Sequence, residues 1–218
     1  MKYLGDPQSG SAAGTTASRN RFGQYFRTRR APVNPRSTQQ GIVRARLALA
    51  SANWRALTDA QRAAWKDLGL QMTRTDSLGS TYTLQGNQAF VSVNSAKGAA
   101  GDAQVTDPPA LLTPGSILTA VVTLTAASFS IAYTGTPLPA GARLFTYVSP
   151  QGSAGKSFQS DMRLLQVSAA AAASPANALA AYTAKFGVPV VGNRIFITLV
   201  VYLGGFLSGP FYTSQVVS

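Results

Sequence analysis

The sequence predicts an α+β protein with three parts: an extended N-terminal arm, a small helical hairpin domain and a C-terminal β-sandwich of the immunoglobulin or fibronectin type. Arginines alternate with aromatic residues near the N-terminus, and apolar residues then recur at helical spacing. The last part is rich in Val, Ile, Thr, Tyr and Phe between turn signals. The expected ranges are 1–36 for the arm, 37–97 for the helical domain, 98–116 for a linker and 117–218 for the sandwich.

The charge of the chain is strongly positive and unevenly distributed. The 218 residues include 19 Lys and Arg but only 7 acidic residues, which gives a net charge of +12. The stretch from Arg19 to Arg55 contains nine arginines and no acid. Such a stretch attracts polyanions or an acidic protein surface.

The composition argues against catalysis. The chain has no His, no Cys and no Glu, so the commonest general base and the thiolate and imidazole metal ligands are missing. The segment Gly152–Lys156 resembles a phosphate loop but lacks the GxxxxGK[ST] spacing, and we interpret it as a turn. We therefore expect a protein that is not an enzyme and that needs no cofactor and no metal.

The arm carries the residues that we expect to bind a partner. The candidates are Arg19, Arg21, Phe22, Tyr25, Phe26, Arg27, Arg29 and Arg30. In a strand, Arg27 and Arg29 would lie on one side and Phe26 on the other. The arginines could bind the phosphates of a nucleic acid, or the aromatic rings could anchor the arm on a neighbouring subunit while the arginines pair with carboxylates. The aromatic anchors favour the second interpretation.

Apolar spacing predicts two helices after the proline-containing bend. The residues of the first stripe recur at intervals of four and three and are Val43, Leu47, Ala50, Trp54 and Leu57. A capping box at Thr58–Gln61 starts the second helix, which we expect to stop at Gly69. Because the joint is short, the two helices should form a hairpin with Trp54 and Trp65 in their shared core.

The rest of the helical domain is expected to contain a short strand over Thr81–Leu84 and a third helix over Gln88–Lys97. Asn87 should cap this helix and Gly98 should end it. In the last part, the predicted strands are Ile117–Thr125, Ser128–Tyr133, Arg143–Val148, Arg194–Leu203 and Phe211–Val217. A helix over Pro175–Phe186 should interrupt them.

Three segments together resemble a group of largely uncharacterised proteins from bacteriophages and bacterial genomes. They are the arm SRNRFGQYFRTRRAPVNP, the hairpin WRALTDAQRAAW and the helix GNQAFVSVN, and the similarity covers about residues 14–94. It implies a virion structural protein of the capsid, neck or tail. The resemblance assigns no activity to individual residues.

These observations lead to a first hypothesis about function and to alternatives. The chain would assemble with other subunits of the same kind, and with other virion proteins, through its arm. The alternative is an architectural nucleic-acid-binding protein that uses the arginines, and a third option is a non-viral surface or filament subunit. No apolar run reaches the length of a membrane span and the start MKYLGDPQSGS has no signal-peptide core, so we expect no membrane partner and a virion protein made in the host cytoplasm.

Overall fold

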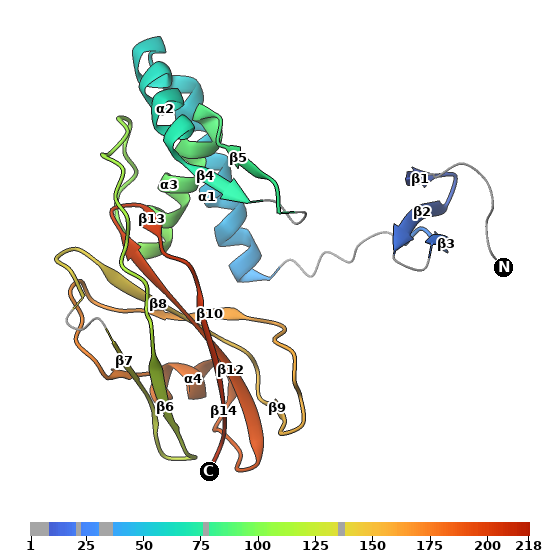
Figure 1. The fold of residues 1–218 in the computed structure, drawn as a ribbon, viewed down its shortest axis with the longest axis vertical. Helices are drawn as coiled ribbons and strands as arrows, with labels where there is room; N and C mark the ends of the chain where they lie inside the picture. Colours follow the sequence, from blue (N-terminus) through green and yellow to red (C-terminus); the bar gives the residue numbers. More distant parts are fainter. Residues whose placement is uncertain (1–8, 21–22, 31–36, 76–78, 135–137) are drawn as a thin grey trace. The chain divides into compact units, whose positions relative to one another are not determined.

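A computed structural model describes residues 9–20, 23–30, 37–75, 79–134 and 138–218. The described residues form four helices and several antiparallel sheets, so the fold is mixed α+β. The chain divides into two compact units, Met1–Ile42 and Val43–Ser218, and each is described by itself (Figure 1). Among the described residues, no helix is both long enough and apolar enough to cross a membrane.

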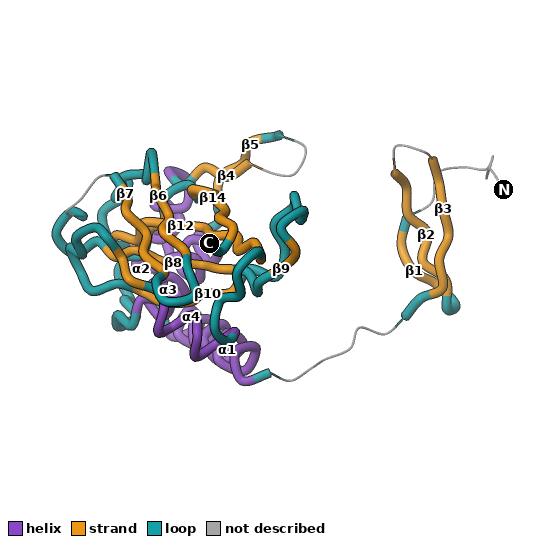
Figure 2. The backbone as a smooth tube through the Cα atoms, turned by 90° about the horizontal axis from the view of Figure 1, so that it is seen from below, coloured by secondary structure: helices purple, strands orange, loops and turns teal. Residues whose placement is uncertain are grey.

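The described residues from 9 to 30 in the first unit form a three-stranded antiparallel sheet whose strands lie side by side in Figure 2. Its strands are β1 (Gly10–Ala12), β2 (Thr15–Asn20) and β3 (Gly23–Thr28). Ala13 and Gly14 both have positive φ, 43° and 80°, as a two-residue hairpin turn requires. The expectation of a single extended arm is therefore wrong for these residues, because this turn and the β2–β3 connection fold the chain back on itself.

The two predicted helices are present as α1 (Thr38–Ala56) and α2 (Asp59–Gln71). The capping box is confirmed: the Gln61 backbone N–H donates to Thr58 Oγ1 at 3.2 Å, and the Thr58 N–H donates to Gln61 Oε1 at 3.1 Å. The predicted end at Gly69 is wrong, because α2 continues past it. An added Cβ at Gly69 would lie 2.5 Å from the Leu84 carbonyl oxygen, so this glycine permits close packing instead.

A third helix, α3 (Gly86–Ala100), completes the helical core. Trp65 is fully buried with its ring 5.1 Å from that of Phe90, and the Trp54 ring lies 5.6 Å from the same phenylalanine. The two tryptophans thus share a core to which α3 contributes the central ring. The strands β4 (Thr73–Thr75) and β5 (Thr81–Thr83) form a hairpin between α2 and α3, and β5 confirms the predicted strand.

The predicted ends of the third helix are wrong. Its N-cap is Gln85, whose backbone N–H donates to Gln88 Oε1 at 3.0 Å, rather than Asn87. Its C-cap is Gly101, which adopts the left-handed φ of 83°. Gly98 lies inside the helix, where the side chain of Arg46 packs against it.

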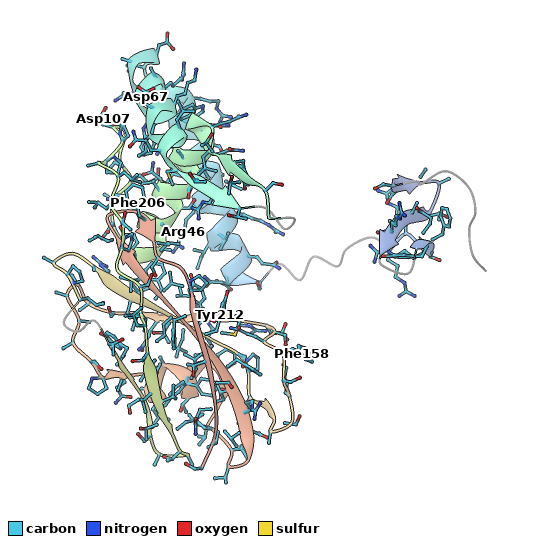
Figure 3. All side chains as sticks on the ribbon, viewed as in Figure 1. Arg46, Asp67, Asp107, Phe158, Phe206 and Tyr212 are labelled. Atoms are coloured by element: carbon cyan, nitrogen blue, oxygen red, sulfur yellow. The ribbon has the colours of Figure 1, made fainter. Side chains whose placement is uncertain are left out.

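Residues 101–119, which we call the strap, have no regular secondary structure but are tied to the helices by hydrogen bonds. Buried Asn94 bonds through its amide to both the N–H and the carbonyl of Val105. Trp65 Nε1 donates to the Thr106 carbonyl at 2.7 Å. Asp107, which lies beside the helices in Figure 3, accepts a hydrogen bond from Gln61 Nε2 at 3.1 Å. Residues 105–107 of the segment expected to be a linker are therefore held against the helices, while the domain ranges themselves stay a prediction.

Two antiparallel sheets form the rest of the second unit. The smaller sheet has the order β11-β7-β6, and the larger has the order β10-β8-β12, with β14, β13 and β9 also pairing with β12. The bounds are β6 (Ala120–Leu124), β7 (Phe129–Tyr133), β8 (Arg143–Val148), β9 (Gly152–Ser153), β10 (Arg163–Val167), β11 (Ala176–Asn177), β12 (Asn193–Leu203), β13 (Phe206–Leu207) and β14 (Phe211–Val216). The five predicted strands are confirmed as β6, β7, β8, β12 and β14, and the sequence analysis missed β10.

The two sheets share one hydrophobic core. Ile195, Ile197 and Leu199, which alternate along β12, are fully buried in it. The helix α4 (Leu179–Phe186) adds Tyr182, which is also fully buried. The helix starts later than predicted because the chain just before it, β11, pairs with β7.

The opposite face of β12 supports the helices. Tyr202 and Val200 pack with Phe145 of β8 against Ala96 and Ala100 of α3. The larger sheet also contributes a side chain to the helical core: Phe206 of β13 belongs to it, and Figure 3 shows this residue where helices and sheets meet. These contacts place the helices and the sheets in one compact unit.

Candidate functional site

The β2–β3 ladder of the first unit positions the described candidate residues. The cross-strand pairs that place them are Thr16 with Arg27, Ala17 with Phe26, Ser18 with Tyr25 and Arg19 with Gln24. The backbone N–H of Arg29 donates to the Gly14 carbonyl at 2.7 Å, which extends the ladder beyond β3. Because side chains alternate along each strand, this register fixes the face on which each side chain lies.

The two aromatic side chains lie on opposite faces of this sheet. Alternation places Tyr25 with Arg27 on one face and Phe26 with Arg19 on the other. The predicted separation of Arg27 from Phe26 is thus confirmed. Each face combines one aromatic ring with at least one guanidinium group.

These side chains are accessible. Tyr25 and Phe26 are 39% and 44% exposed. The described arginines of the segment are also exposed: Arg19, Arg27, Arg29 and Arg30. None of these arginines forms an ion pair within the described part of the chain. The sequence has no acid between Asp6 and Asp59, so residues 9–58 supply no carboxylate to compensate this positive charge.

Two of the predicted site residues, Arg21 and Phe22, lie outside the described residues. Arg19, Tyr25, Phe26 and Arg27 come together on a single small sheet, and Arg29 and Arg30 directly follow its last strand; one extended segment was predicted for all of them. The available signal in the sequence was Gly14, because glycine adopts the positive φ of tight hairpins without strain.

The structure also exposes apolar residues that the sequence placed in one stripe. Val43 and Leu47 of α1 are 54% and 51% exposed, whereas Ala50 and Leu57 of the same stripe are buried. Only the C-terminal half of the stripe reaches the core formed around Trp65. The spacing of apolar residues identifies one face of a helix. It does not show how far along that face the neighbouring elements extend, so it cannot predict which apolar residues are exposed.

The clearest perturbed pKa values belong to tyrosines of the second unit. Burial raises the pKa of Tyr182 to about 12. Burial also raises the pKa of Tyr202, and its hydrogen bond to Asp102 adds to the effect. Both groups are packed in hydrophobic clusters, which is typical of a structural role. Within the described residues, no three His, Cys, Asp or Glu side chains gather as a possible metal site.

Comparisons with known proteins gave no match to a family model, to a curated protein or to a solved structure.

Proposed function

We propose that this protein is a non-enzymatic structural component of a bacteriophage virion, in the capsid, neck or tail, and that it assembles through its N-terminal sheet. The observation that carries the proposal is the exposure of Tyr25 and Phe26 beside uncompensated arginines. Aromatic residues and arginine are the side chains most enriched at the energetic centres of protein interfaces.

The burial pattern of the N-terminal sheet supports a docking role. None of residues 9–19 and 23–30 is buried. A small sheet needs a packed apolar face to be stable, and this one has none within the described residues of its own unit. Docking on a neighbouring subunit of the same kind, or on another virion protein, would cover an aromatic face and give the arginines carboxylate partners.

Nucleic-acid binding is the second candidate, and the arrangement of the arginines favours it. Alternation places Arg27 and Arg29 on one side of the ladder, where both could contact the same phosphate backbone. We rank it second because phosphate contacts alone do not require two exposed aromatic rings on opposite faces.

We further propose that the two sheets of the second unit form an immunoglobulin- or fibronectin-like sandwich that projects from the assembly or adds contacts to it. The strand order supports this interpretation. In chain order, β6 and β7 lie in one sheet, β8 and β10 in the other, β11 returns to the first, and β12 and β14 lie in the second. Crossing between the two sheets in this way is typical of Greek-key sandwiches.

Two paired variants of the full chain test the proposal. Tyr25→Ser with Phe26→Ser removes the aromatic anchors, and Arg27→Gln with Arg29→Gln removes charge from the same strand. Sedimentation velocity should show that the aromatic pair abolishes the large species, while the arginine pair weakens assembly mainly at low salt. Two results together would replace the proposal with the nucleic-acid alternative. The Tyr25→Ser, Phe26→Ser variant would assemble as the wild type does, and the wild-type chain would bind DNA with an affinity that falls steeply with salt.

A further inference from the structure

A hollow on the surface of the second unit lies between α2 and the turn that leads into α3. Its volume is about 520 Å³. The side chains that shape it are Trp54, Arg62, Lys66, Leu70, Leu84 and Asn87. A hollow of this size accepts a few side chains of a peptide rather than the surface of a folded domain.

The walls of the hollow are held in place by close backbone contacts. An added Cβ at Gly86 would lie 3.0 Å from the backbone nitrogen of Lys66. On the neighbouring turn of α2, a Cβ added at Gly69 would lie 2.5 Å from the Leu84 carbonyl oxygen. Since α2 and the turn before α3 touch at two glycines, the hollow exists before any partner arrives, which lowers the cost of binding.

The hollow offers apolar surface to a partner. Leu70 is 57% exposed although it lies on a helix that buries its opposite face. Trp54 is half-buried, and its contact with Phe90 fixes the indole ring. A rigid aromatic ring beside an exposed leucine is suited to receive one apolar side chain.

The charge around the hollow is positive. Among the described residues, Arg62 and Lys66 are the ionisable ones that line it, and no acid does so. Arg62 pairs with Asp59 at 2.9 Å, whereas Lys66 forms no ion pair within the described residues. An acidic partner would therefore be attracted to the Lys66 side of the hollow.

We propose that this hollow binds an acidic segment of another protein, which inserts an apolar side chain between Trp54 and Leu70 and places a carboxylate beside Lys66. The chain's own N-terminal sheet is a poor occupant, because residues 9–30 contain arginines and no acid. The chain as a whole carries a net charge of +12, so charge complementarity favours a different, acidic protein over a second copy of the chain. The hollow is distinct from the N-terminal sheet, so this proposal does not depend on whether that sheet mediates assembly.

The test measures binding of a fluorescein-labelled peptide, rich in Asp and Glu with a central Leu and Phe, to the full chain. Fluorescence anisotropy should show saturable binding that Lys66→Glu weakens roughly tenfold or more. Leu70→Ser should also weaken it, through loss of apolar contact. The matched control is Arg163→Glu, which reverses an exposed charge on β10 outside the hollow and should leave the affinity unchanged.

Several outcomes would overturn the proposal. The wild-type chain could fail to bind the peptide, or Arg163→Glu could weaken binding as much as Lys66→Glu, which would mean general attraction by a basic protein. Displacement of the peptide by oligo-dT would assign the surface to nucleic acid. Loss of self-association in Lys66→Glu would assign it to a second copy of the chain. Circular dichroism of each variant verifies that it is folded.

Discussion

The Tyr202 hydroxyl donates a hydrogen bond of 2.5 Å to Asp102 Oδ2, and this bond ties the first residues of the strap to the middle of the larger sheet. The second carboxylate oxygen of Asp102 accepts from Arg143 Nη2 at 2.8 Å, and Arg143 also donates to the Ala100 carbonyl at the end of α3. One acid therefore joins the end of a helix, the strap and two strands. This cluster lies beside the apolar contact between α3 and the sheet.

Asp102→Asn tests the importance of this cluster. The amide keeps the shape of the side chain but removes its charge and one of its acceptors, so Arg143 or Tyr202 loses a partner in a half-buried site. We expect the free energy of unfolding in urea to fall by about 1–3 kcal/mol. Asp67→Asn, on the exposed face of α2, is the matched control and should change it by less than about 0.5 kcal/mol.

Two helical glycines should respond to alanine with opposite signs. Gly69→Ala would place a Cβ 2.5 Å from the Leu84 carbonyl oxygen, so the backbone has to shift, and we expect a destabilisation of about 1–3 kcal/mol. Gly98→Ala places its Cβ 3.5 Å from the flexible Arg46 side chain, an ordinary contact. Helix propensity should then stabilise the protein by about 0.5–1 kcal/mol. Equal effects in thermal unfolding would contradict this account of Gly69.

Trp65→Phe should loosen the strap. The substitution keeps an aromatic ring near Phe90 but removes the indole N–H that donates to the Thr106 carbonyl. We expect a loss of about 1–3 kcal/mol and faster amide hydrogen exchange in residues 104–106. Trp54→Phe, at the half-buried tryptophan, should cost less. Unchanged exchange in the strap of the Trp65 variant would show that other contacts hold it.

Stability should decline at high pH in a way that depends on Tyr182. Burial raises the pKa of this phenol from 10.0 to about 12, so the folded protein keeps a proton that the unfolded chain releases. The unfolded state then binds fewer protons, and this contribution to stability is complete below pH 10 and lost between pH 10 and 12.

Replacement by phenylalanine isolates the effect. In Tyr182→Phe, the loss of unfolding free energy across that pH range should be smaller by roughly 2 kcal/mol than in the wild type. Some loss should remain, because burial also raises the pKa values of Tyr202, Tyr133 and Tyr147. Parallel pH profiles for variant and wild type in urea titrations would show that Tyr182 does not cause the decline.

Local sequence signals predicted the elements that depend on local physics. The capping box of Thr58 and Gln61 marked the start of α2, because both hydrogen bonds form within one helical turn. Enrichment in Val, Ile, Thr, Tyr and Phe between turn signals likewise marked β8 and β12 within one residue of their observed bounds. Glycine was a poor signal for helix ends, since Gly69 and Gly98 lie inside helices and pack closely there.

The remaining features depend on partners distant in the sequence. The strap has the Gly, Asp and Pro content of a linker, and its path is fixed by bonds from distant residues that include Asn94, Trp65 and Tyr202. Local sequence patterns do not predict that Lys66 and Leu70 border a hollow with Trp54, because a different helix supplies the tryptophan. In the N-terminal segment, the alternation of Phe26 and Arg27 was predictable, whereas its folding into a sheet depends on pairing with β2.

The most direct test of the proposed function compares the native mass of the full chain with that of a chain that begins at Ser37. The shortened chain keeps the residue whose hydroxyl accepts from the Gln40 N–H at the start of α1, so its second unit should remain folded. Light scattering and electron microscopy should show an ordered assembly for the full chain and only monomers for the shortened one. An assembly of unchanged mass and appearance from the shortened chain would contradict the account.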